Sequence, residues 1–230
     1  MNEELPSSQI KKILGKLKGT RVEEILLEMD AAYGRISNEQ SAWYSGSGFT
    51  CPEGCGECCR NFEPDILECE ATYMAAWLLE NQPEVAQKVA EGEFPYPRQG
   101  GCQFWKEDDP YHCSIYGGRS FICRLFGACS NHDKAGQLVF KPCKFYPEEK
   151  LQEYKTPLTH RQYSQQEVEK IFGTLPPAME NLMEEALSFD PGNHETMLIR
   201  EILPQTVRRI QWLLMMNNGN DDDTPEPLAC

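Results

Sequence analysis

The stretch Cys51-Pro-Glu-Gly-Cys55-Gly-Glu-Cys58-Cys59-Arg60 decides how this chain is interpreted. A thiolate is a soft, charged ligand that suits Zn(II), Cu(I) and iron–sulfur clusters. Spacers of two and three residues let a tight turn bring successive sulfurs to one centre, with glycines in the spacers for backbone freedom. Because consecutive side chains point in different directions in most conformations, we expect one of Cys58 and Cys59 to serve a second metal or another edge of the core. The stretch predicts a metal site without specifying the metal.

Cysteine is abundant beyond this stretch. The chain has 11 cysteines, at positions 51, 55, 58, 59, 69, 102, 113, 123, 129, 143 and 230, and ten of them lie between Cys51 and Cys143. The N-terminus has no signal-peptide core, so we expect a cytoplasmic protein in a reducing compartment. Thiols at this density in such a compartment bind metal more often than they form disulfides or remain as inert buried thiols.

Nine of these thiols are candidate metal ligands, namely Cys51, Cys55, Cys58, Cys59, Cys102, Cys113, Cys123, Cys129 and Cys143. Nine thiols are enough for two tetrahedral sites of four ligands each, with one to spare. Cys69 lies inside a predicted helix and Cys230 is the last residue, so we expect neither to bind metal. His112 and His132 are the histidines near the cluster, and His132 follows Cys129 with the C-x2-H spacing of some zinc sites.

Buried thiolates need compensating positive charge. Five Lys or Arg and one Asp lie between Cys113 and Pro147, and Arg60, Arg119 and Arg124 are the candidates for cations next to the metal. Aromatic residues gather in the same region, since 11 of the chain's 23 Phe, Trp and Tyr residues fall between Phe94 and Tyr146. We expect them to form either an ordinary small core or a dry shell that tunes a redox potential.

The flanking segments predict helices, so the fold class is mainly α, with a loop-rich cysteine core and at most short strands. Apolar residues recur at helical spacing over 10–17, 22–36 and 67–78. We predict a Gly/Ser linker at 45–48, a capping box at Ser164-Gln-Gln-Glu167, and a helix divided at Pro204. The C-terminal methionines are expected in the core and the lysines of 11–18 on a solvated face. The predicted units are 1–48 (helical), 49–147 (metal-binding), 148–217 (C-terminal helices) and 218–230 (a disordered acidic tail).

Composition narrows the classes of partner. The 230 residues carry a formal charge of −14, which argues against duplex nucleic acid, because such binding rests on neutralising phosphates. The longest apolar run, Met74 to Leu79, is far shorter than a membrane span. No Walker loop, dinucleotide fingerprint, H-E-x-x-H or nucleophile elbow is present. A protein substrate or a redox partner, including a basic one, fits this composition.

The segments CPEGCGECCR, GGCQFW and HCSIYGGRSFICRLFG resemble the YkgJ-type CxxCxxCC family, which is described as zinc- or iron-chelating and often labelled as Fe–S oxidoreductases. The resemblance covers about residues 49–147. It implies that Cys51, Cys55, Cys58, Cys59, Cys102, Cys113 and Cys123 are ligands, and that either Cys129 or Cys143 is the last one. Ser120 stands where the family usually has proline, which changes local stiffness but no ligand.

Two further resemblances concern the reaction. The FliB-type lysine methylases have a similar cysteine cluster but are longer, and no additional motif for S-adenosylmethionine appears here. The spacing Cys51-x3-Cys55-x2-Cys58 is similar to that of radical-SAM enzymes, but no strand and helix alternation for their partial barrel follows. We therefore expect a protein with one or two iron–sulfur clusters, [4Fe–4S] favoured, in a redox or protein-modifying role. The alternatives are a zinc-stapled interaction module and, third, a SAM-dependent methylase-like enzyme.

Overall fold

The computed structural model describes residues 9–51, 55–188 and 195–218. The acidic tail predicted beyond Asn218, including Cys230, lies outside these residues. The described chain is mainly α-helical, as predicted, and its strands are only two or three residues long. None of the described helices has the length and apolar character needed to cross a membrane.

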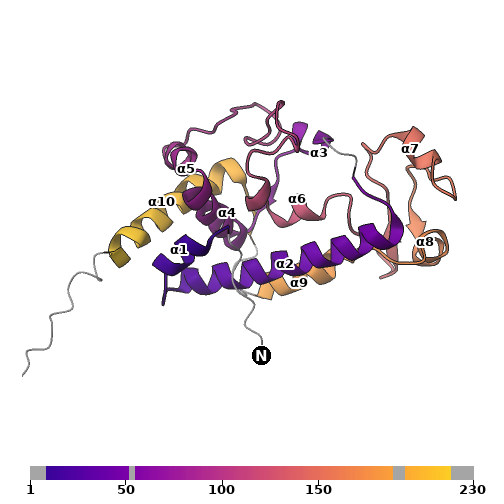
Figure 1. Cartoon of the computed structure of the whole chain (residues 1–230), viewed down its shortest axis with the longest axis horizontal. Helices are drawn as coiled ribbons and strands as arrows, with labels where there is room; N and C mark the ends of the chain where they lie inside the picture. Colours follow the sequence, from indigo (N-terminus) through magenta and orange to yellow (C-terminus); the bar gives the residue numbers. More distant parts are fainter. Residues whose placement is uncertain (1–8, 52–54, 189–194, 219–230) are drawn as a thin grey trace, which may run out of the picture.

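The helices form a packed layer around two long elements, α2 (Arg21–Ser47) and α10 (Ile199–Asn218). The helix α4 (Glu68–Asn81) lies between them, and α5 (Pro83–Ala90) packs against α4 and α10, while α1 (Lys11–Lys16) and α9 (Met179–Ser188) flank the layer. Figure 1 shows α2 along one side of the molecule with α9 beside it, and α4, α5 and α10 grouped at one end. This layer is the scaffold that carries the cysteine region.

The segments between the long helices contain short elements. These are α3 (Glu57–Arg60), the 3-10 helix η1 (Tyr116–Gly118), α6 (Phe121–Leu125), α7 (Glu148–Gln152) and α8 (Gln165–Phe172). Strand β1 (Asp65–Ile66) pairs antiparallel with β5 (Met197–Leu198), which joins the starts of α4 and α10. The other sheet has the order β2 (Asn131–His132), β3 (Leu138–Phe140), β4 (Tyr163–Ser164).

Two apolar cores meet along α2. The larger core takes buried residues from Ile10 to Ile210 and contains Leu26, Met29 and Ile36 of α2. The smaller core surrounds Trp43, at the C-terminal end of α2, and contains Phe49 and Phe140. The helix α2 therefore connects the helical layer to the β2–β3–β4 unit, and the cysteines lie between the two cores.

Three sequence-based expectations were wrong. The predicted linker at 45–48 is the last turn of α2, which ends only at Gly48 in the left-handed conformation, φ +65°, because Trp43 anchors this turn in the smaller core. The helix α10 runs unbroken through Pro204, since the packing of its neighbours Leu203 and Val207 in the core offsets the lost backbone bond. The expectation for the C-terminal methionines was wrong only in part: Met179 and Met183 pack against the larger core, whereas Met215 and Met216 are 66% and 54% exposed on α10.

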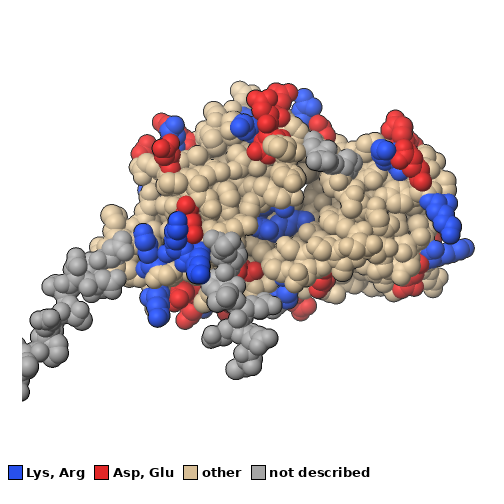
Figure 2. All heavy atoms as spheres, in the orientation of Figure 1, with Lys and Arg blue, Asp and Glu red and all other residues tan. Residues whose placement is uncertain are grey.

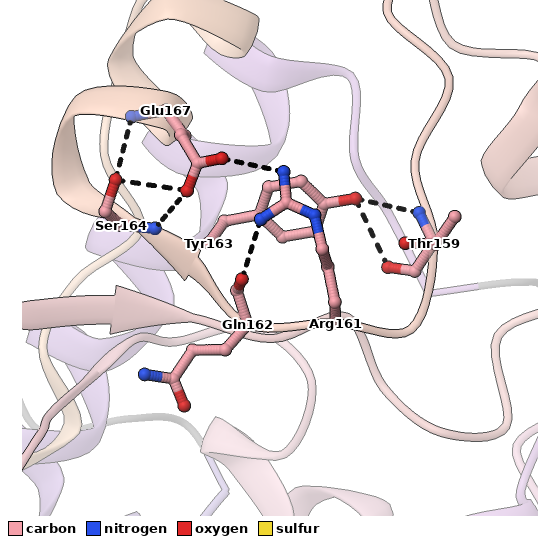
Figure 3. Close-up of polar contacts among 6 residues, drawn as sticks. All are labelled: Thr159, Arg161, Gln162, Tyr163, Ser164 and Glu167. Atoms are coloured by element: carbon pink, nitrogen blue, oxygen red, sulfur yellow. Dashed lines mark hydrogen bonds and ion pairs between the residues drawn. The ribbon is translucent and has the colours of Figure 1, made fainter.

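The capping box at the start of α8 is confirmed. Ser164 Oγ accepts from the Glu167 N–H, and Glu167 Oε2 accepts from the Ser164 N–H at 2.9 Å. Figure 3 shows that Arg161 reaches back to the same carboxylate, 2.7 Å away, while its guanidinium lies over the Tyr163 ring. These contacts hold α8 against β4 and keep the smaller core closed.

We predict that Ser164→Ala lowers the free energy of unfolding by about 1 kcal/mol, because it leaves the helix N-terminal N–H group of Glu167 without its acceptor. Chemical denaturation followed by circular dichroism measures the change. Ser37→Ala, at an exposed position inside α2, is the matched control and is expected to cause almost no loss. Equal losses in the two variants would contradict the role of the cap.

Candidate metal centre

Five separate segments bring cysteines to one cavity. The cavity has a volume of about 230 Å³ and is lined by seven of the nine candidate thiols, Cys51, Cys55, Cys58, Cys59, Cys102, Cys113 and Cys123. They come from the loop before α3, from α3 itself, from the loops at 102 and 113, and from α6. No disulfide joins any cysteine in the described part of the chain.

A smaller cavity of about 40 Å³ adjoins the first. It is lined by Cys51, Cys55 and Cys58, which also line the larger cavity, and by Cys143, which does not. Phe49, Phe126 and Tyr146 complete its wall. Eight of the nine candidates therefore surround two adjoining spaces.

Cys129, the ninth candidate, lies apart from both cavities. Its Sγ donates a hydrogen bond to the Leu125 carbonyl at 3.0 Å, which closes the turn after α6. His132, the residue in C-x2-H spacing with it, is also away from the cavities and contacts the Glu180 carboxylate through both its backbone N–H and its Nδ1. Cys69 is buried in the larger core within α4.

Three of the thiols share one local backbone arrangement. The sulfurs of Cys102, Cys113 and Cys143 each accept a hydrogen bond from the backbone N–H two residues later, at Phe104, Ile115 and Phe145. Donors of this kind stabilise a thiolate and favour its use as a metal ligand.

The turn at Gly101 fixes the contact between two thiol-bearing segments. The Cys102 N–H donates to the Cys59 carbonyl at 3.1 Å. Gly101 has φ +80°, and a Cβ atom placed there would lie 2.3 Å from the Arg60 carbonyl oxygen. Only glycine allows the two backbones to approach this closely.

Without metal, most of these thiols are held in the neutral form. Burial raises the pKa of Cys123 to about 12, and it also raises the pKa of Cys102, Cys113 and Cys143. Cys58 is the exception, because a hydrogen bond from the Cys59 thiol lowers its pKa to about 7 and raises that of Cys59. A bound cation would have to displace these protons, so binding metal here releases protons.

The three candidate cations have different surroundings. Arg119 lines the cavity and stacks on Tyr116 at 3.4 Å. Its charge helps to lower the pKa of Cys58 and partly offsets the rise that burial causes in the pKa values of Cys113 and Cys123. Arg124 also lines the cavity but donates to the Arg119 and Gly117 carbonyls. Figure 2 shows Lys or Arg atoms inside a hollow at the level of α6. Arg60 is exposed beside Glu57 and lines neither cavity.

Some aromatic residues form the wall of the larger cavity, and others lie at its solvent-exposed rim. Trp105 lines the larger cavity, sandwiched between Arg98 and the His112 ring, and its buried Nε1 has no hydrogen-bond partner among the described residues. Tyr111 and Tyr116 line the same cavity with 55% and 41% of their area exposed. The aromatic region thus encloses the thiols on one side and meets solvent on the other.

Two residues at the cavity were missed from the sequence. Gln40 and Tyr44 reach it from α2, and Gln40 Nε2 donates to the Arg124 carbonyl. The apolar stripe of 22–36 continues to these positions at helical spacing, since Tyr33, Ile36, Gln40 and Tyr44 follow one another three or four residues apart. This continuation of the apolar stripe is the sequence signal that could have identified the two positions.

The donor set fits a soft metal. Its parts are thiols that line one cavity, backbone N–H groups beside the sulfurs, a cation, and a buried indole N–H without a partner among the described residues. The Cys58 and Cys59 sulfurs lie 3.7 Å apart, close to the edge of about 3.8 Å expected for two thiolates on one tetrahedral zinc. Among the described residues, no three Cys, His, Asp or Glu side chains converge closely enough to enclose an ion as they stand.

The fold and the site define a mainly α-helical protein with a cysteine-rich metal-binding region. A scan against family models matches residues 50–171, more than half of the chain, to the model described as "CxxCxxCC: Putative zinc- or iron-chelating domain". The chain belongs to this CxxCxxCC family, and its function is metal chelation at the level of that description. No curated protein and no solved structure matches the chain.

We predict that Gly101→Ala lowers both the free energy of unfolding and the metal content, because the added Cβ forces the Cys59 and Cys102 segments apart. Gly92→Ala is the matched control, since Gly92 has φ +89° but open space around its Cβ position. The control is expected to cost about 1 kcal/mol from the left-handed conformation alone. Gly101→Ala should lose more and bind less metal, measured by denaturation and elemental analysis; equal effects would contradict the close approach.

Proposed function

We propose that this protein is a cytoplasmic iron–sulfur protein whose cluster, of the [4Fe–4S] type, is held by the thiols of the larger cavity. The observation that carries the proposal is the presence of seven thiols on one cavity of about 230 Å³. A structural zinc ion takes four ligands in a closed tetrahedral site. Seven thiols around an open space favour a group larger than a single ion.

The surroundings of the thiols support the same choice. Hydrogen bonds to the sulfurs, net charge and solvent exposure set the potential of an iron–sulfur cluster. The N–H groups of Phe104 and Ile115, the Arg119 guanidinium and the Trp105 indole supply such influences around this cavity. A zinc staple needs none of them to stabilise a fold.

A cluster at this position would supply one-electron transfer or activation of a substrate at an iron without a fourth protein ligand. The residues of the chain would then have separate tasks. Arg119 offsets thiolate charge, Trp105 and Phe104 exclude water, and the exposed rings of Tyr111 and Tyr116 form the rim that a redox partner or protein substrate meets. Free thiols at this density also fit a reducing cytoplasm.

Zinc remains the second candidate because of one observation. The 3.7 Å separation of the Cys58 and Cys59 sulfurs matches two ligands on one tetrahedral ion. A zinc-stapled protein would be an interaction module without catalysis, in which the metal contributes folding free energy.

Anaerobic purification separates the two. We expect a brown protein with iron and acid-labile sulfide in equal amounts. A colourless protein that holds stoichiometric zinc, with no cluster after reconstitution with iron and sulfide, would overturn the proposal in favour of zinc.

We predict that Cys123→Ala loses most of this iron and sulfide, because Cys123 is a lining thiol of the larger cavity. Cys129→Ala is the matched control: it removes a thiol that lines neither cavity and donates to the Leu125 carbonyl. The control should retain full metal content by elemental analysis. Cys69→Ala should retain it as well, since Cys69 packs in the helical core. Loss of metal in either control would contradict the ligand assignment.

A further inference from the structure

The eight thiols that line the two cavities fall into two groups of four, according to whether they line the smaller cavity. Cys59, Cys102, Cys113 and Cys123 line only the larger cavity. Cys51, Cys55, Cys58 and Cys143 are the four thiols that line the smaller one. A four-thiolate set is the ligand number of one tetrahedral metal site or of one iron–sulfur cluster.

The first group, the inner four, is held by bonds between its own segments. The Cys102 N–H donates to the Cys59 carbonyl at 3.1 Å. The backbones of Trp105 and Cys113 pair in an isolated antiparallel β-bridge. The Ser120 hydroxyl donates to the Cys123 sulfur at 3.2 Å. Cys102 itself is buried, 7% exposed.

The second group, the outer four, lies on the side of the smaller core. Cys143 packs against Gly127, with its Cβ 3.3 Å from the position of an added Gly127 Cβ atom, and accepts from the Phe145 N–H. Phe49 and Tyr146, which line this cavity, stack with ring centroids 4.8 Å apart. Cys51 in this group is exposed to solvent.

The two groups of thiols meet within α3 (Glu57–Arg60). Cys58 and Cys59, one from each group, are the point of contact, with their sulfurs 3.7 Å apart.

We propose that the chain holds two adjoining metal centres, an inner one on Cys59, Cys102, Cys113 and Cys123 and an outer one on Cys51, Cys55, Cys58 and Cys143. The inference deepens the proposed iron–sulfur function and assigns Cys143, not Cys129, as the eighth ligand. The outer centre has an exposed thiol and is therefore the more accessible to chelators and to exchange.

The test is metal and sulfide content per chain, measured after anaerobic reconstitution with iron and sulfide. Cys143→Ala should remove the outer centre and keep about half of the wild-type metal. Cys113→Ala and Cys102→Ala should each remove the inner centre, and Cys129→Ala should keep all of it. Circular dichroism reports whether each variant keeps its helices, and a variant that unfolds is replaced by the other inner variant.

Electron paramagnetic resonance of the reduced wild-type protein is the second measurement. Two neighbouring clusters should give spectra broadened by spin coupling, which Cys143→Ala should abolish. A folded Cys143→Ala variant that keeps all of its metal, or a wild type with only one cluster per chain, would overturn the two-centre assignment while leaving a single iron–sulfur site. Two zinc ions per chain, one lost in Cys143→Ala, would instead support two centres and overturn the iron–sulfur function.

Discussion

The carboxylate of Glu70 connects the helical layer to the cysteine region. It is 4% exposed in the first turn of α4, where Oε2 accepts from the Leu67 N–H at 2.8 Å and Oε1 accepts from the Phe121 N–H at 2.7 Å. Phe121 begins α6, the helix that presents Cys123 to the cavity. Burial raises the pKa of Glu70 to about 7. The free-energy cost of removing this carboxyl group from water is offset by its two backbone hydrogen bonds. The orientation of α6, and with it the closure of the larger cavity, depends on that balance.

Much of the scaffold follows from periodic patterns in the sequence. The apolar stripes of 10–17, 22–36 and 67–78 predict α1, α2 and α4, and the capping box predicts the start of α8. The errors arose where a local signal was outweighed by packing. Ser45 to Gly48 is typical of a linker, yet the burial of Trp43 in the smaller core continues the helix. Pro204 signals a break, yet Leu203 and Val207 are buried on either side of it.

The residue types that form the site could be predicted from the sequence, but their arrangement in space could not. The spacing within 51–59 predicts that these thiols are neighbours, because spacers of two and three residues keep them close together. Nothing local indicates that Cys143 reaches Cys51 while Cys129 turns away to the Leu125 carbonyl. That outcome depends on the packing of Cys143 against Gly127 and on the path of the chain through β2 and β3, and both are tertiary features. The cations divide for the same reason, since Arg119 faces the thiols and Arg60 faces solvent.

The larger core has a consequence for how the protein matures. Its buried residues run from Ile10 to Ile210 and come mostly from α1, α2, α4, α5 and α10, while Cys69 and Cys102 are its buried cysteines. Small zinc fingers are unfolded without their metal. A helical body of this size can assemble on its own after synthesis, with the cavity formed in advance. The metal or cluster would then be inserted late, into a protein that has already folded. A protein that delivers it would recognise the folded chain rather than a nascent one.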